Sequence, residues 1–394
     1  MKILQINDDY ERVGGAETYF FNLIELLEKK GHQVFVFAIR GKPMKTKDIL
    51  VVGEAKSFLG HYFSSKIFNF KVHFKLKKLI AKTRPDIIHL HNNYLAPFSV
   101  LLAIRGHKVV QTIHDYMILC PSGWMVKKNS LEICQGNIGA KCLKNNCLSF
   151  HNLLISYLPF KLRVATSKRV VNKFISPSKK LKEYLETFGF QNVQNLPYFL
   201  NVKNYCFNPK LKKDGNILYV GRLVKEKGIE DLIKALPKVT SKISQANLII
   251  VGDGPQRKHL ISLTKKLGMT NKVDFVGKIP HKKIKEYYQE ASVVVVPSFW
   301  LDNSPNVVYE AFSAGRPVIA SNRGGMSDFV KDGETGFIFE SGNVENLAQK
   351  IITIFKNDGL FRKLSVDCRQ FACANLTPEK HYREIMKIYK EDEN

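Results

Sequence analysis

Short apolar runs alternate with longer amphipathic segments from one end of the chain to the other. Runs rich in β-branched residues are typical of strands, and the segments between them have the pattern of helices. Strands that alternate with helices build parallel sheets that are covered by helices. In the first half of the chain we expect strands at residues 2–7, 33–39, 87–91, 108–114 and 173–178.

The same pattern starts again in the second half, so the sequence predicts a second sheet. Its expected strands are residues 216–221, 247–252, 272–277, 292–298, 317–321 and 336–340. Between the halves, residues 197–215 are rich in Pro, Asn and Lys and lack periodicity, which is typical of a linker.

A length of 394 residues suits two domains better than one core. We predict an α/β fold with two Rossmann-like parallel-sheet domains, residues 1–198 and 199–376, and a C-terminal helix at 377–394 that can pack back on the first domain. Parallel sheets bind ligands at the carboxyl ends of their strands, so two such domains facing a central cleft would bind through their strand-to-helix loops.

The charge of the chain is strongly basic, with 61 Lys and Arg against 35 Asp and Glu and a net charge of +26. Residues 55–85 contain no acid and interleave lysines with aromatic residues, and residues 133–182 also contain no acid. Cations mixed with apolar anchors favour an anionic membrane surface. A solvated basic face is the alternative, and nucleic acid is disfavoured because no reader motif accompanies the charge.

The apolar runs of the chain are too short to span a bilayer, which takes about 20 residues. Asp8, Asp9 and Glu11 interrupt the amino terminus where a signal peptide would need an apolar stretch. We therefore expect a cytoplasmic protein that is peripheral on the inner face of the cell membrane.

The first loop with candidate chemistry follows the first expected strand. A helix should begin near Gly15 or Ala16, and paired glycines at a helix amino terminus let backbone N–H groups approach an anion. Plain turn chemistry explains the Gly-Gly pair equally well. The loop lacks the G-x-G-x-x-G pattern, which argues against a nicotinamide dehydrogenase.

Loops of the second half carry cations and glycines. Arg222 and Lys227 lie between a strand and a helix, where two cations and helix amides suit a diphosphate. Gly252 and Gly254 form a tight turn of the kind found beside nucleotides. A solvated basic loop and a purely structural turn are the respective alternatives.

Two carboxylates, Asp302 and Glu310, follow the apolar run 292–298 with no basic residue between them. Ser304 is the expected N-cap of the next helix and Pro305 its first residue, which would place Glu310 about one and a half turns into that helix. Carboxylates in such a place can accept hydrogen bonds from sugar hydroxyls.

The motifs "GGAE", "GRLVKEKG", "VGDGP", "D-x7-E" and "AFSAGRPVIAS", in this order, resemble those of the retaining glycosyltransferases of family 4, which have the GT-B fold. The resemblance implies a nucleotide-sugar donor and no required metal or other cofactor. It also implies roles for single residues. Arg222 and Lys227 would stabilise the departing diphosphate, and Glu310 would hold the ribose. Asn303 and Ser304 would contribute amides, and Gly15 would face the diphosphate.

Two residues, one in each half of the chain, bear on how the donor sugar would be recognised. The family usually has glutamate where this chain has Asp302, one methylene shorter, so the resemblance leaves the sugar open. By the same resemblance His114 contacts the sugar near its reaction centre, and the alternative is a core histidine bonded to the neighbouring Asp115. His89 and His91 are expected as strand-end structure or acceptor lining.

Four cysteines fall within 28 residues: Cys120, Cys134, Cys142 and Cys147. Four thiolates can bind zinc as a closed tetrahedral site. Their spacings are not those of C-x2-C pairs, and ordinary reduced cysteines are the alternative in a cytosolic protein.

Together these features predict a retaining glycosyltransferase that moves a sugar from a nucleoside-diphosphate-sugar to a lipid-linked glycan acceptor in surface polysaccharide biosynthesis. Two alternatives stay open. One is a GT-B epimerase or hydrolase, which would consume the donor without an acceptor. The other is a non-catalytic member that binds a glycan or a membrane, and Asp302 is the feature that lends it support.

Overall fold

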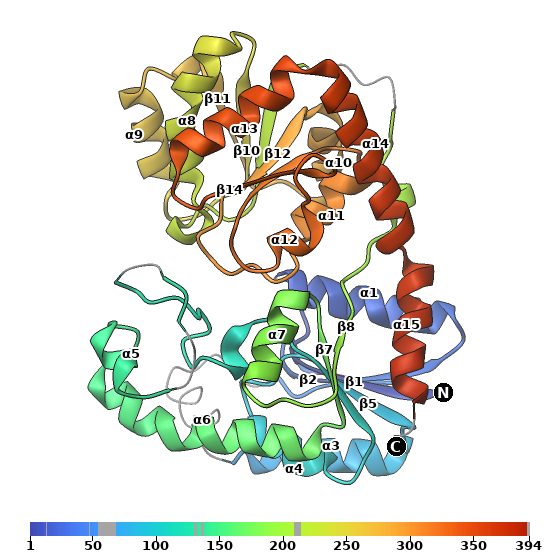
Figure 1. Cartoon of the computed structure of the whole chain (residues 1–394). Helices are drawn as coiled ribbons and strands as arrows, with labels where there is room; N and C mark the ends of the chain where they lie inside the picture. The colour runs from blue at the N-terminus through green and yellow to red at the C-terminus, as the bar shows by residue number, and fades with distance from the viewer. Residues whose placement is uncertain are drawn as a thin grey trace. The chain divides into compact units, whose positions relative to one another are not determined.

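The computed structural model describes residues 1–12, 14–46, 48–53, 68–129, 132–134, 138–208 and 214–391, apart from the side chains of residues 281 and 282 (Figure 1). The chain divides into two compact units. Unit 1 is Met1–Pro197 with His381–Asn394, and unit 2 is Tyr198–Lys380.

Unit 1 is built on a sheet with the strand order β3-β4-β2-β1-β5-β6-β7-β8. All neighbouring strands are parallel except β3, which is antiparallel to β4. The five strands expected from the first half of the sequence all form. The short strands β3, β4 and β8 were not predicted. The bounds are β1 (Lys2–Asp9), β2 (Gln33–Arg40), β3 (Met44–Lys45), β4 (Ile49–Val51), β5 (Ile87–Leu90), β6 (Val109–Thr112), β7 (Lys173–Ser176) and β8 (Val193–Asn195).

Helices cover this sheet (Figure 1). Their apolar faces pack inward: Phe20, Leu23 and Leu27 of the first helix are fully buried. The helices of unit 1 are α1 (Gly15–Lys29), α3 (Phe70–Thr83), α4 (Pro97–Ile104), α5 (Ala140–Lys144), α6 (Phe150–Val170), α7 (Lys179–Thr187) and the short 3-10 helix η1 (Tyr116–Ile118).

The last helix, α15 (Pro378–Lys390), belongs to unit 1 from His381 onward. Its His381 ring lies 3.0 Å from the hydroxyl of Tyr19, and the hydroxyl of Tyr389 lies 2.6 Å from Nδ1 of His89. Both side chains of α15 are buried. These buried polar contacts fix the position of the helix in unit 1.

Unit 2 has a fully parallel sheet with the order β11-β10-β9-β12-β13-β14. All six strands expected from the second half are present. They are β9 (Asn216–Val220), β10 (Asn247–Val251), β11 (Val273–Gly277), β12 (Val293–Val296), β13 (Val318–Ser321) and β14 (Gly336–Phe339). Because β10 and β12 lie on opposite sides of β9, the strand order reverses there, which is where parallel sheets bind ligands.

The helices of unit 2 connect these strands. They are α8 (Ile229–Lys242), α9 (Arg257–Lys266), α10 (His281–Glu290), α11 (Asn306–Ser313), α12 (Met326–Phe329), α13 (Val344–Lys356), α14 (Asp358–Asn375) and the 3-10 helices η2 (Val202–Asn204), η3 (Lys225–Lys227) and η4 (Thr270–Lys272).

The predicted linker is partly built into unit 2. Tyr198, Val202 and Tyr205 are buried, and Arg369 donates to the carbonyls of Val202 and Tyr205 at 3.2 and 3.1 Å. Buried aromatic side chains therefore anchor this stretch, although its sequence has no helix or strand periodicity. Among the residues that the structure describes, no helix combines the length and the apolar character needed to cross a membrane.

Candidate active site

The loops that follow β9, β10 and β12 in unit 2 interlock through their backbones. The amide of Leu223 donates to the carbonyl of Asp253 at 3.0 Å, and the amide of Phe299 donates to the carbonyl of Glu226 at 2.8 Å. Three loops from neighbouring strands are thus bound to one another at the point where the strand order reverses.

The predicted glycines make this interlocking possible. A Cβ at Gly252, which has φ +142°, would meet the carbonyl oxygen of Gly221 at 1.9 Å. A Cβ at Gly254 would meet the carbonyl oxygen of Leu223 at 2.5 Å. The packing of the loops therefore requires glycine at both positions, whether or not the turn also contacts a ligand.

Lys227 and Asp302 form an ion pair. The ammonium group of Lys227 donates to the two carboxylate oxygens of Asp302 at 2.6 and 2.8 Å, and the side chains are 25% and 16% exposed. Gly228, at φ +66°, turns the chain directly after Lys227, and a Cβ there would meet the carbonyl oxygen of Pro297 at 1.9 Å. The two residues that the sequence assigned to the diphosphate and to the sugar thus contact each other.

Arg222 lies in the same loop and is exposed. The hydroxyl of Tyr219 donates to its backbone carbonyl at 3.0 Å, which fixes the backbone from which the guanidinium extends. Burial raises the pKa of Tyr219, and the charge of Asp302 adds to the shift. The loop therefore offers an exposed cation, Arg222, in addition to Lys227, which is paired with a carboxylate.

The helix that carries Glu310 begins differently from the prediction. Pro305 is the N-cap and Asn306 the first helical residue, and no side chain caps the helix. Ser304 is not the N-cap because its hydroxyl is hydrogen-bonded to the hydroxyl of Tyr309. Glu310 consequently lies about one turn into the helix rather than one and a half.

Glu310 is buried, with 6% exposure, and two phenols bind it. The hydroxyl of Tyr288 donates to its Oε2 at 2.8 Å, and Tyr205 is a second hydrogen-bond partner. Burial raises the pKa of both phenols, and the negative charge of Glu310 raises it further. The carboxylate is therefore fixed in place, and Asn303 and Ser304 are buried in the loop before it.

His114 follows β6 in unit 1 and is 8% exposed. Its Nε2 lies 3.0 Å from Nδ1 of His91, and the two rings stack. Nε2 of His91 lies 2.7 Å from Oε1 of Gln5, and because this oxygen can only accept, Nε2 carries the ring proton. Nδ1 of His91 therefore accepts a hydrogen bond from Nε2 of His114. Burial lowers the pKa of His114 to about 3, and the ring is neutral at pH 7.

His89 stacks on His91 and so belongs to the same buried network, whereas the printed contacts of Asp115 are with other residues. His89 is fully buried and contacts the hydroxyls of Tyr389 and Thr112 at 2.6 and 2.8 Å. Asp115 accepts from the hydroxyl of Tyr94 at 2.7 Å and from the amide of Met117 at 2.8 Å. His89 lies within β5 (Ile87–Leu90) and His91 directly after it, and both are buried.

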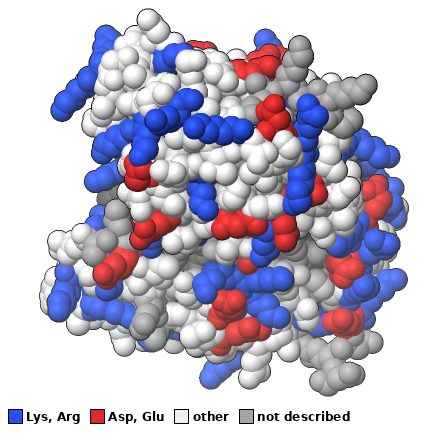
Figure 2. All heavy atoms as spheres, turned by 45° about the horizontal axis from the view of Figure 1, so that its top comes forward, with Lys and Arg blue, Asp and Glu red and all other residues white. Residues whose placement is uncertain are grey.

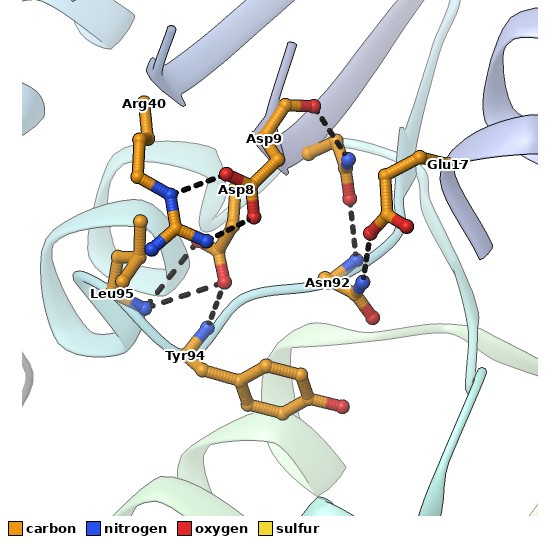
Figure 3. A network of polar contacts seen from close by, with 8 residues as sticks. Asp8, Asp9, Glu17, Arg40, Asn92, Tyr94 and Leu95 are labelled. Carbon is orange, nitrogen blue, oxygen red and sulfur yellow. Dashed lines mark hydrogen bonds and ion pairs between the residues drawn. The ribbon is translucent and has the colours of Figure 1, made fainter. Parts of the chain in front are cut away.

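The carboxyl end of β1 carries an acidic network that the sequence did not reveal (Figure 3). Asp9 forms a two-pronged ion pair with Arg40 at the end of β2. Asp8 accepts from the amides of Tyr94 and Leu95 at 2.6 and 3.3 Å. Burial raises the pKa of Asp8 to about 7, against the lowering effect of the two amides.

Glu17 lies beside this network in the first turn of α1, which begins at Gly15 as predicted. Nδ2 of Asn92 donates to Oε1 of Glu17 at 3.2 Å (Figure 3). Burial raises the pKa of Glu17. The helix end that was expected to face an anion therefore carries a buried carboxylate of its own. The sequence does contain a signal for this network: acids directly after the first expected strand and another acid shortly after the Gly-Gly pair.

Comparison with known proteins covers both units. The family described as Glycosyltransferase Family 4 matches residues 13–197, and the family described as Glycosyl transferases group 1 matches residues 204–372. The 2-deoxystreptamine N-acetyl-D-glucosaminyltransferase of Niallia circulans is 26% identical over 241 residues, which is 60% of this chain and 60% of that protein.

Solved structures share the fold across the whole chain. Sucrose-phosphate synthase from Thermosynechococcus elongatus has a TM-score of 0.75 and 22% identity, over 99% of this chain and 98% of that one. Anabaena HepE in complex with UDP has a TM-score of 0.75 and 20% identity, over 98% and 99%, and it is also solved with UDP-glucose. The matched segments of both units and the shared fold show that the chain belongs to the GT-B glycosyltransferases of family 4, glycosyl transferases group 1.

Proposed function

We propose that this chain is a retaining glycosyltransferase that moves a sugar from a nucleoside-diphosphate-sugar to a lipid-linked glycan acceptor in surface polysaccharide biosynthesis, at the inner face of the cell membrane. The observation that carries the donor assignment is the grouping of two cations and two carboxylates at the reversal of strand order in unit 2. The UDP and UDP-glucose complexes of HepE, which has the same fold, support this class of donor.

Each group of unit 2 then has a chemical task. Arg222 and Lys227 compensate the charge that the diphosphate gains as its bond to the sugar breaks, and such preorganised stabilisation is often the largest catalytic contribution. Glu310, held by Tyr205 and Tyr288, accepts hydrogen bonds from the ribose hydroxyls. Because side-chain cations supply the positive charge, the proposal needs no metal.

Asp302 has two roles in this proposal. It holds Lys227 in place before the donor binds, and it presents a carboxylate to the sugar hydroxyls. Asn303, Ser304, Gly252 and Gly254 complete the donor loops. In unit 1, Gly15 and the neutral ring of His114 are proposed donor contacts, and a neutral ring can direct a sugar hydroxyl without adding charge.

The membrane part of the proposal rests on one surface of unit 1. Helix α4 packs against both α3 and α6, and we call the exposed side of these three helices the apolar–basic face. Its exposed large side chains are Phe70, Phe74, Leu102, Phe150, Leu154, Tyr157, Leu158 and Leu162. On α6 they recur every three or four residues, so they share one side of the helix.

Charge also characterises this face. Helices α3 and α6 contain no acid, and their exposed cations are Lys71, Lys77, Lys78, Lys82, Lys161, Lys168 and Arg169. Figure 2 shows a face of the molecule where Lys and Arg are mixed with Asp and Glu. Apolar side chains among cations without acids complement an anionic bilayer.

The experiment that tests the function is a turnover screen of the purified protein with UDP- and GDP-sugars, with and without an extract of lipid-linked acceptors. Release of diphosphate from one donor only when the extract is present supports the transferase, and the anomeric configuration of the product tests retention. Donor consumption without acceptor supports the epimerase or hydrolase instead. No turnover with any donor and extract, from protein that binds a nucleotide, would refute the proposal.

A further inference from the structure

Four cysteines of unit 1 gather around one cavity in the segment of chain between η1 and α6. Cys120, Cys134, Cys142 and Cys147 all line it, together with Lys127 and Lys141. All four are free thiols. Cys142 is the most buried, and burial and the proximity of the other three thiols raise its pKa. The thiols are therefore neighbours in space, although up to 27 residues separate them in sequence.

Local backbone hydrogen bonds bring the first two thiols to the cavity. The amide of Cys120 donates to the carbonyl of Tyr116 at 2.8 Å, which ends η1 in a turn. Val126 and Ile133 form an antiparallel bridge, and the amide of Cys134 donates to the carbonyl of Met125 at 2.7 Å. The chain thus folds back and returns Cys134 toward Cys120.

Helix α5 and the turn after it supply the other two thiols. The amide of Cys142 donates to the carbonyl of Gly139 at 2.9 Å, and the amide of Cys147 donates to the carbonyl of Cys142 at 2.8 Å. The turn after α5 therefore brings Cys147 back to the cavity. Four separate pieces of local structure converge on the same place.

Apolar burial in this region is spread over several small groups. Ile138, Cys142 and Phe160 form one cluster with a few partly buried neighbours, and Leu119, Met125 and Val126 are also buried. Disulfides and metals are the crosslinks that stabilise short segments with limited cores. The four thiols are the groups in this region that can supply such a crosslink.

The charged side chains that line the cavity, apart from the cysteines, are lysines. Lys127 and Lys141 line the cavity and Lys144 lies in α5, while the carboxylate of Glu132 is paired with Lys127 at 2.7 Å. A divalent ion with four thiolates carries a net charge of −2, which these lysines compensate.

We propose that Cys120, Cys134, Cys142 and Cys147 bind one Zn²⁺ as a closed tetrahedral site that holds the segment between η1 and α6 together. In binding, each thiol releases its proton to solvent and forms one Zn–S bond. Four thiolates leave no open position for a substrate, so the site is structural and independent of the proposed glycosyl transfer.

The binding requires a local contraction. In the part of the chain that the structure describes, no three His, Cys, Asp or Glu side chains are placed closely enough to hold a metal ion. Zn–S bonds of about 2.3 Å would draw the sulfurs to roughly 3.8 Å from one another. The proposed site therefore needs the four cysteine side chains that line the cavity to rotate toward one another.

The direct test is the metal content of the full chain, purified without chelators and measured by plasma mass spectrometry. We expect about one zinc per chain in the wild type and in Cys206→Ser and Cys373→Ser, two matched controls that replace exposed cysteines of unit 2. Cys134→Ser and Cys147→Ser should each lower the bound zinc at least tenfold. Zinc retained by both cavity variants would overturn the assignment.

A second measurement does not depend on variants that fold. Wild-type protein titrated with Co²⁺ should develop the sulfur-to-cobalt charge-transfer band and the intense visible bands of a tetrahedral thiolate site, with one equivalent saturating them. Added Zn²⁺ should remove these bands. A wild-type protein that contains no zinc and yields no cobalt–thiolate spectrum would refute the proposal, whatever its glycosyltransferase activity.

Discussion

Lys227 donates to both carboxylate oxygens of Asp302, at 2.6 and 2.8 Å, although 75 residues separate the two in sequence. The cation proposed for the diphosphate is therefore partly neutralised before a donor binds. Because both side chains are only 25% and 16% exposed, solvent screens this pair less than a surface pair. In the proposed function, a diphosphate would compete with Asp302 for the same ammonium group.

This competition predicts that Asp302→Asn strengthens the binding of UDP. Removing the carboxylate releases Lys227, and we expect about three- to tenfold tighter binding, or about 0.7–1.4 kcal/mol. Turnover should fall because the sugar loses a charged partner. Isothermal titration with UDP measures the first effect. Asp253→Asn is the control, since it removes an exposed acid but keeps the oxygen that accepts from the amide of Gly254. Weaker UDP binding by Asp302→Asn would contradict the competition.

Glu310→Gln should lower kcat/KM by about a hundredfold or more while the protein stays folded. Gln keeps the shape of the side chain and an oxygen that can accept from Tyr288, but it loses the negative charge offered to the ribose. Steady-state kinetics and a thermal melt of the same preparation separate the two effects. Turnover within a factor of two of the wild type would remove Glu310 from the donor site.

The role of Tyr288 in positioning Glu310 can be tested against a control residue on the same helix, α10. Tyr288→Phe removes the hydrogen bond to Glu310, and we expect kcat/KM to fall about tenfold, mainly through a raised KM for the donor. Tyr287→Phe changes the neighbouring, partly buried tyrosine and should leave both constants unchanged. Equal effects of the two variants would show that Tyr288 acts only through the stability of α10.

Much of the fold could be predicted because its strands are buried apolar runs. The run 292–298 predicted β12, whose four valines are buried on both faces. Strands β3, β4 and β8 could not be predicted, because two or three residues are too few to show the alternating pattern of a strand. Ser304 was mistaken for an N-cap because a hydroxyl partner from the helix itself, Tyr309, is not visible in a capping pattern.

The positions of the candidate site residues could be predicted better than their contacts. Loop positions after strands indicated Lys227, Asp302 and Glu310, but the ion pair joins residues on two different loops. The phenols that hold Glu310 come from α10 and from a stretch that was interpreted as linker. The perturbed carboxyl of Asp8 results from burial, which a sequence with three acids near its start does not disclose.

The apolar–basic face predicts binding to anionic vesicles that depends on charge. Reversing Lys71, Lys78 and Lys82 of α3 to Glu should weaken binding to vesicles with phosphatidylglycerol by about a hundredfold or more, since each cation near the surface contributes about 1 kcal/mol. The matched control reverses Lys258, Lys265 and Lys266, three exposed lysines of α9 in unit 2. Co-sedimentation at low salt measures both. Equal losses in the two triple variants would assign the binding to net charge alone.

Asp8 predicts a pH dependence of stability with a definite sign. Its folded pKa of about 7 lies above the ordinary value of 3.8 because burial outweighs the amides of Tyr94 and Leu95 and the charge of Arg40, while Asp9 adds repulsion. Between pH 4 and 7 the folded state holds a proton that the unfolded state has lost, so the free energy of unfolding falls as the pH rises through this window. Asp8→Asn cannot ionise. Its melting temperature relative to the wild type should therefore rise from pH 5 to pH 8, while Asp86→Asn, an exposed control at the other end of β1, should show no such trend. A difference between Asp8→Asn and the wild type that stays constant with pH would mean that Asp8 does not titrate in this window, and that its carboxylate is ionised in the folded protein throughout.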